Sequence, residues 1–175
     1  MKKHMIIGIV FFLLVASLVL TSHGRNNMNL DFAEILASEN IDDLSLTIYY
    51  VSFNMFTPWP WRLKDLIEMR DGKIIVSGSE LEETIDLIKQ INSDILIQEQ
   101  GEPWAPYFRL YYVLESKENG RLFDVAMWGI RGGIVFNGVE VEEHYIFYDI
   151  VIPFLPEEIA ELMRRGRDVL AYGSE

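Results

Sequence analysis

An uncharged, apolar run near the amino terminus constrains the fold of this chain more than any other feature of its sequence. It extends over 16 residues, from Met5 to Leu20, and Thr21 and Ser22 continue it. A signal-peptide core has about 7–15 apolar residues and a membrane-spanning helix has about 20, so the run lies between the two. A core helix of a globular domain is disfavoured, because the run is apolar on every side.

Two fates therefore stay open for residues 1–24, a cleaved signal peptide or a single membrane anchor. No A-x-A cleavage site follows the run, and the best small-residue site, at Ser22, has Leu20 at its outer position. This favours an uncleaved anchor. Lys2 and Lys3 precede the run, and such positive charges stay on the cytoplasmic side of the membrane.

The remaining chain is expected to lie outside the cell. We predict a single-pass protein of the cell membrane, held through residues 5–22, with its N-terminus in the cytoplasm; secretion after cleavage is the alternative. Residues 25–29 are polar and are interpreted as a linker. Residues 30–175 are long enough to form one extracytoplasmic domain.

This outer part has no cysteine and a large excess of acidic residues. Because Lys2 and Lys3 are the only charged residues before Arg25, the remaining chain has 13 Lys and Arg against 27 Asp and Glu, a formal charge of −14. Phosphate backbones repel such a surface, so we expect no nucleic-acid partner. The same charge favours basic partners. The lack of cysteine excludes disulfides, thiolate zinc sites and cysteine nucleophiles.

Hydrophobic periodicity predicts an α+β fold, with a mainly antiparallel sheet packed by about four helices. A helical spacing of apolar residues indicates helices over 29–40, 61–69, 79–91 and 155–170. For the third helix, Ser79 and Glu82 have the spacing of a capping box. Runs of β-branched and aromatic residues indicate strands over 44–53 and 73–78, and a strand or an extended link over 94–100.

Two hairpins are expected in the second half of the chain, over 107–129 and 132–154. Asn119-Gly120 and Asn137-Gly138 are candidates for their type I′ turns. In the second hairpin the alternation of apolar and polar residues fails at residues 142–144, which predicts a bulge or a break there.

Only one histidine, His144, lies within residues 30–175, and no metal or cofactor motif accompanies it, so we expect no cofactor and no metal site. On a regular strand Glu142 and His144 would face the same side, as candidates for proton transfer. The simpler interpretation is that these polar side chains are exposed on an edge strand, where charges prevent pairing with another chain. Asp124 and Asp149 are further catalytic candidates, because each lies in a predicted apolar strand. Each is either on the wet face or buried with a partner.

Three tryptophans lie beside prolines in predicted loops. Trp59 and Trp61 belong to the stretch FTPWPWRL, and Trp104 follows a proline directly. Loops often carry binding residues, and aromatic faces stack on sugars or hold peptide side chains, so these three are candidate ligand-binding residues. The alternative is that they cap the core, because large aromatics are usually buried. Pro60 suits the first turn of the following helix, so the prolines themselves require no ligand.

Three hypotheses for function follow. The first is a non-enzymatic, membrane-anchored or secreted domain that binds a protein, a peptide or a cell-envelope glycan; it rests on the acidic charge, the tryptophans and the lack of a catalytic motif. The second is a hydrolase of envelope polymers that uses His144 with nearby carboxylates. The third is an acidic inhibitor that blocks a basic active site.

Overall fold

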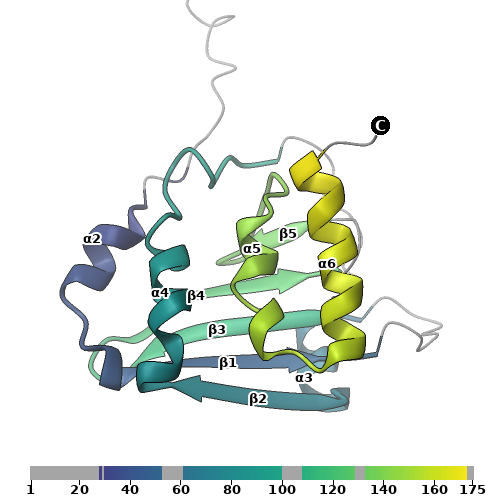
Figure 1. Cartoon of the computed structure of the whole chain (residues 1–175), viewed down its shortest axis with the longest axis horizontal. Coiled ribbons are helices and arrows are strands. Elements are labelled where there is room, and N and C mark those ends of the chain that lie inside the picture. The colour runs from purple at the N-terminus through teal and green to yellow at the C-terminus, as the bar shows by residue number, and fades with distance from the viewer. Residues whose placement is uncertain (1–27, 29, 53–60, 100–107, 129–132, 173–175) are drawn as a thin grey trace, which may run out of the picture.

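The computed structural model describes residue 28 and residues 30–52, 61–99, 108–128 and 133–172. These residues form an α+β fold in which helices pack on a six-stranded antiparallel sheet (Figure 1). The predicted anchor, residues 1–24, lies outside the described residues, as does the 25–29 linker apart from Met28. No helix within the described ranges is long and apolar enough to cross a membrane.

The sheet has the strand order β2-β1-β3-β4-β5-β6, and each neighbouring pair is antiparallel. This confirms the predicted α+β class and the antiparallel sheet. The strands are β1 (Leu44–Tyr50), β2 (Gly72–Ser77), β3 (Leu110–Ser116), β4 (Gly120–Met127), β5 (Ile134–Phe136) and β6 (Val139–Val141).

In the described part of the chain, five α-helices and three 3₁₀ helices accompany this sheet, against the four helices or so that the sequence predicted. The α-helices are α2 (Phe32–Ala37), α3 (Leu63–Met69), α4 (Glu82–Ile88), α5 (Ile146–Asp149) and α6 (Glu157–Tyr172). The 3₁₀ helices are η1 (Ile41–Asp43), η2 (Gly78–Leu81) and η3 (Ile152–Phe154).

The two Asn-Gly turns close their hairpins in different ways. Asn137 and Gly138 both have positive φ, 48° and 79°, as a type I′ turn requires, so that prediction is confirmed. At the other turn only Gly120 has positive φ, and the pairing of β3 with β4 shifts after Leu114. The hairpin is confirmed there, but its turn is not type I′. A longer connection and a bulge replace it.

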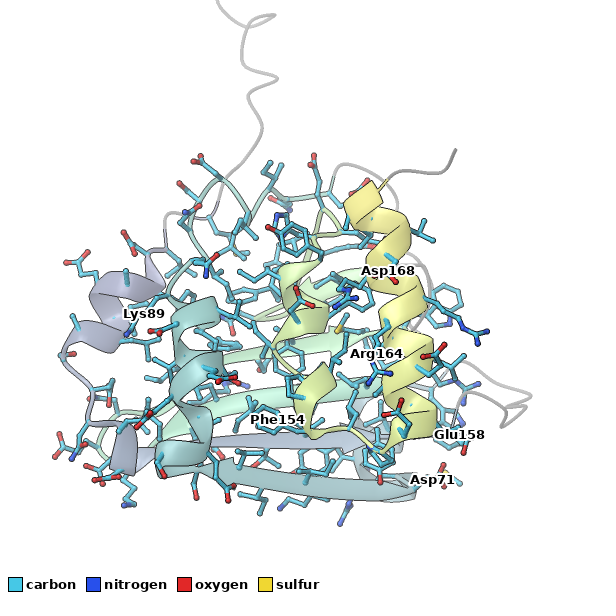
Figure 2. All side chains as sticks on the ribbon, in the orientation of Figure 1. Asp71, Lys89, Phe154, Glu158, Arg164 and Asp168 are labelled. Atoms are coloured by element: carbon cyan, nitrogen blue, oxygen red, sulfur yellow. The ribbon has the colours of Figure 1, made fainter. Side chains whose placement is uncertain are left out.

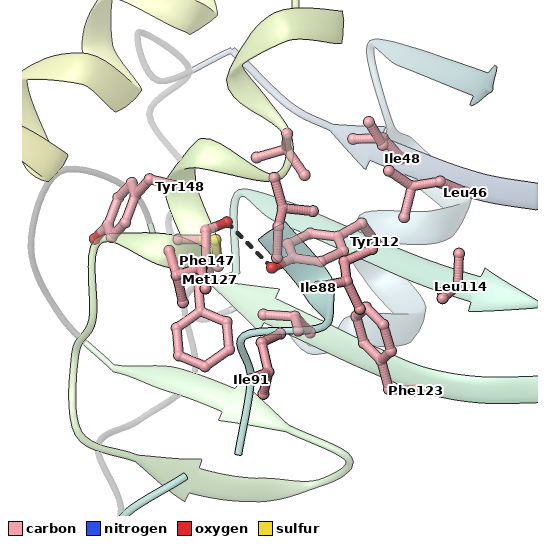
Figure 3. Close-up of a cluster of buried hydrophobic side chains, with 14 of the residues drawn as sticks. Leu46, Ile48, Ile88, Ile91, Tyr112, Leu114, Phe123, Met127, Phe147 and Tyr148 are labelled. Atoms are coloured by element: carbon pink, nitrogen blue, oxygen red, sulfur yellow. Dashed lines mark hydrogen bonds between the residues drawn. The ribbon is translucent and has the colours of Figure 1, made fainter. Parts of the chain in front are cut away.

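The main core lies between one face of the sheet and the helices α2, α4, α5 and α6 (Figure 1). Alternate residues of the central strands point into it, among them Ile48, Tyr112 and Phe123, all fully buried. Figure 3 shows the Tyr112 hydroxyl donating a hydrogen bond of 3.1 Å to the carbonyl oxygen of Phe147. This bond ties the central strand β3 to the short helix α5.

A smaller core lies on the opposite face of the sheet, where α3 packs. Trp61 and Leu66 contribute from the α3 segment, and Tyr111, Val113 and Ala126 contribute from β3 and β4. Both faces of the central strands are therefore covered, which explains why β3 is buried at almost every position.

The segment after β6 departs from the prediction. The chain leaves the sheet at Val141, so the expected break at residues 142–144 is confirmed. The strand that was expected to continue to residue 154 is absent; α5 and η3 occupy that stretch. One turn of helix buries Ile146, Phe147 and Tyr148 together against the main core. Burial among helices thus outweighs the β-propensity of these aromatic and branched residues.

The start of the predicted 79–91 helix is also corrected. Ser79 lies inside η2, and α4 begins at Glu82 without a side-chain cap hydrogen bond. The predicted capping box of Ser79 and Glu82 is therefore wrong. The physical reason is the tight exit from β2: Gly78 takes a φ of 61°, and the 3₁₀ turn then buries Leu81 completely. A 3₁₀ turn is a common connector at such a helix start.

Candidate functional site

A cavity of about 340 Å³ lies between the beginning of α4 and the 3₁₀ helix η3. Two segments far apart in the sequence form it, and Figure 2 shows Phe154 of η3 between α4 and α6. Its polar lining comes from Ser79, Glu80, Glu82, Glu83 and Thr84, and its apolar lining comes from Leu87, Pro153 and Phe154. We call it the acidic cavity, because three of its eight lining residues are glutamates.

The chain path after β2 places these glutamates at the surface. Gly78 turns the chain off the end of the strand, and Leu81 is fully buried in the main core. With Leu81 directed inward, Glu80, Glu82 and Glu83 are all exposed. Three carboxylates within four consecutive residues therefore surround the buried leucine and line one wall of the cavity.

The carboxylates of the acidic cavity differ from those of α6 in their ionic partners. Among the described residues, no Lys, Arg or His forms a salt bridge with Glu80, Glu82 or Glu83, whereas Glu157 and Glu161 of α6 pair with Arg164 and Arg165. Glu82 and Glu83 lie in the first turn of α4, where the helix dipole stabilises negative charge. The cavity is thus a region of negative potential that the described protein leaves without a counter-charge.

Thr84 also belongs to the lining of the cavity, although the residue is only 3 % exposed.

The histidine that the sequence singled out lies elsewhere, at the start of α5. The backbone N–H of Ile146 donates to Nδ1 of His144 over 3.3 Å, so this nitrogen acts as an acceptor within its own turn. Burial lowers the pKa of the His144 imidazole below its ordinary value, and the nearby Asp149 carboxylate partly opposes that shift. Asp149 itself forms a salt bridge of 3.1 Å with Arg167 of α6.

Glu142 and His144 do not share a strand face, since β6 ends at Val141. The prediction that they project together from a strand is therefore wrong. The same correction applies to Asp149, which belongs to α5 rather than to an apolar strand. The backbone N–H of Glu142 donates to the carbonyl oxygen of Ile97 at 2.8 Å, and this bond holds the chain where it leaves the sheet.

Asp124 lies on the face of the sheet opposite to the main core. It belongs to β4, is 8 % exposed, and accepts a hydrogen bond of 2.6 Å from Arg121. Of the two predicted environments, burial with a partner is the one that the structure shows. Asp124 alternates with Phe123 and Val125, which point into the main core, so it faces the α3 side. In the described ranges no three His, Cys, Asp or Glu side chains come together as a metal site.

Of the three tryptophan candidates, only Trp61 falls within the described residues. It is 8 % exposed in the smaller core, and the Arg109 guanidinium lies over its ring at 5.9 Å. This packing agrees with a core-capping position. Trp59 and Trp104 lie outside the described residues, so their proposed contact with a ligand stays a prediction.

Comparison of the chain with protein-family models, with curated proteins and with solved structures found no match.

The acidic cavity was not predicted from the sequence. Its glutamates are visible in the stretch SELEE, but at a helix start such residues are explained by the helix dipole. Phe154 and Pro153 come from a segment that was predicted as a strand. Only the packing of η3 against α4 turns an ordinary acidic helix start into a lined cavity.

Proposed function

We propose that this protein is a non-enzymatic, membrane-anchored or secreted extracytoplasmic domain that binds a basic side chain of a protein or peptide partner. The acidic cavity carries this proposal, because it combines apolar lining residues with three carboxylates that have no salt-bridge partner among the described residues. At about 340 Å³ the cavity is at the small end of ligand sites, a size suited to one side chain.

Lysine and arginine match the two chemical characters of the cavity. Their alkyl stems favour apolar surface such as Leu87 and Phe154, while their charged ends remain near carboxylates or water. The face of the Phe154 ring can also attract the cation. The surplus of acidic residues in the outer part of the chain would further attract a basic partner.

The alternative, a hydrolase that uses His144 with nearby carboxylates, has less support. Nδ1 of His144 accepts a hydrogen bond from its own turn, and Asp149 is paired with Arg167. Asp124 faces the other side of the sheet. Neither the candidates His144, Asp149 and Asp124 nor Arg167 lines the acidic cavity. A glycan ligand is likewise less supported than a basic peptide, because Trp61 is packed in a core.

The test uses the full chain in detergent micelles and two small probes. N-acetyl-lysine methylamide supplies the stem and the charge, and N-acetyl-norleucine methylamide supplies the stem alone. Ligand-observed NMR measures binding of each probe. We expect binding of the lysine probe only, weakening as salt is raised, because screening shortens the range of charge interactions to about 10 Å at 0.1 M.

Matched variants localise the effect. The double variant Glu82→Gln/Glu83→Gln removes two cavity carboxylates, and Glu34→Gln/Glu118→Gln removes two exposed carboxylates elsewhere. Glu34 also lies in the first turn of a helix. Its replacement therefore removes a negative charge near a helix N-terminus, as the replacement of Glu82 and Glu83 does. Each exposed charge pair is worth up to roughly a fivefold change in affinity. Because the first variant loses two such carboxylates, its affinity for the lysine probe should fall about tenfold or more, and the affinity of the second variant should not change. Equal binding of the norleucine probe, or equal loss in both variants, would refute the proposal.

A further inference from the structure

The two edges of the sheet are treated differently. At the β6 edge the segment 97–99 covers the strand: Gln98 bridges to Val141, and the N–H of Glu99 donates to the carbonyl oxygen of Glu140 at 3.1 Å. At the opposite edge, no described residue pairs with the outer side of β2. The main-chain N–H and C=O groups on that side can therefore accept another strand.

Of the usual devices that block an edge, β2 has one, the charged side chain of Lys73. Its six residues contain no proline, and its pairing with β1 is continuous without a bulge. Lys73 is its one charged residue. Ile75 is 59 % exposed. An exposed apolar residue on an edge strand favours pairing with another chain. Figure 1 shows β2 along the lower border of the sheet, and none of the described helices lies outside it.

This edge leads directly to the acidic cavity. β2 ends at Ser77, and the cavity lining begins two residues later at Ser79. Ile74 and Val76 of β2 pack against the main core, on the same face of the sheet as α4 and η3. A strand added beside β2 would alternate in the same way, so every second side chain would point toward the face that holds the cavity.

We propose that β2 and the acidic cavity together bind an extended peptide segment of a partner protein, which adds a strand to the sheet and places a Lys or Arg side chain in the cavity. This binding mode of the peptide rests on the proposed function, since it assumes that the acidic cavity binds a cationic side chain. Main-chain hydrogen bonds to β2 supply affinity, and the cavity supplies specificity, as in other cases of strand addition.

Two observations select this occupant. The glutamates of the cavity favour a positively charged side chain. Ile75 lies on the opposite face of the added strand and favours an apolar neighbour there. A peptide with a basic residue flanked by apolar residues meets both requirements at once.

The probe is the acetylated heptapeptide Val-Thr-Val-Lys-Val-Thr-Val, with a fluorescent label at its C-terminus. Side chains alternate between the two faces of a strand. When the central lysine points to the face that holds the cavity, the two adjacent valines point to the face of Ile75. A second form carries N-methyl groups on the lysine and on both adjacent valines. These groups remove the N–H donors without changing any side chain, so strand pairing is blocked.

Fluorescence anisotropy with the full chain measures both peptides. We expect the methylated form to bind about tenfold or more weakly, because each lost hydrogen bond is worth roughly a factor of two to ten. Hydrogen–deuterium exchange supplies a second readout: the unmethylated peptide should slow amide exchange in residues 72–77. The variant Ile75→Lys should weaken binding at least fivefold. Met69→Lys, which adds the same charge at an apolar residue of equal exposure outside the sheet, should leave it within twofold.

The outcomes separate the two proposals. If methylation has no effect and residues 72–77 are not protected, strand addition is refuted, while binding of the lysine probe still supports the cavity. If β2 is protected but the lysine of the heptapeptide can be replaced by norleucine without loss, the cation site is refuted. If β2 is protected without peptide, in proportion to protein concentration, a second copy of the chain occupies the edge and the peptide proposal is wrong.

Discussion

The hydrogen bond between Tyr112 and Phe147 offers the sharpest test of how the helical layer is held on the sheet. The tyrosine belongs to the central strand β3 and is fully buried, and its hydroxyl donates to a backbone carbonyl of α5 at 3.1 Å. The substitution Tyr112→Phe removes the hydroxyl and keeps the ring. It therefore leaves the carbonyl oxygen of Phe147 buried without this donor.

The expected loss of stability follows from leaving this carbonyl oxygen without its donor. A buried acceptor that loses its partner destabilises a protein by about 1–3 kcal/mol, more than the net value of an average hydrogen bond. Packing changes add little, because the ring and its edge contact with Phe123 remain. We therefore expect the free energy of unfolding to fall by about 2 kcal/mol. For a chain of this length, that corresponds to a decrease in Tm of about 4–8 °C.

Thermal and urea unfolding of the full chain, followed by near-ultraviolet circular dichroism, measure this change. Tyr145→Phe is the matched control, because it removes the same hydroxyl from a neighbouring tyrosine that is 43 % exposed. Its effect should stay within about 0.5 kcal/mol, as for most surface substitutions. If Tyr112→Phe also stays within that range, the α5 segment is not held on β3 as described.

Two further predictions concern His144 and Trp61. Because burial lowers the pKa of His144, the folded state binds fewer protons than the unfolded state, and the stability of the wild type should rise as pH increases toward about 6.5. His144→Gln should abolish that rise, and unfolding free energies measured between about pH 5.5 and 7.5 check it; an unchanged pH slope would show that the imidazole is not buried. Trp61→Ala should destabilise the protein by about 3–5 kcal/mol, since the ring fills the smaller core. A folded variant of near wild-type Tm in the same thermal scan would contradict this packing.

Much of the sheet could be predicted because its signals are local. The Asn137-Gly138 turn needs two residues that tolerate positive φ, and the sequence shows them between two apolar stretches. The break after β6 was visible because three polar residues in succession cannot continue a half-buried strand. The end of β1 at Tyr50, before the predicted end at residue 53, was not visible, because strand ends depend on which neighbours supply hydrogen bonds.

The candidate site was less accessible from sequence. His144 and Asp149 were chosen for their positions in a predicted strand, and the structure places Asp149 in a helix instead. Residues with high β-propensity can adopt a helical turn when that turn buries all of them at once, as it does for Ile146, Phe147 and Tyr148. The acidic cavity joins α4 to η3, and contacts between such distant segments leave no periodic trace in the sequence.

The sequence by itself determined the acidic charge, the lack of thiol chemistry, the α+β class and the turn at Asn137-Gly138, because each depends on composition or on the backbone preferences of a few neighbouring residues. Only the tertiary structure decided which acids share a surface, which edge strand has no pairing partner among the described residues, and whether the segment after β6 is strand or helix. Those outcomes depend on long-range burial: the main core must be closed by whichever conformation covers the most apolar surface, whatever the local preference.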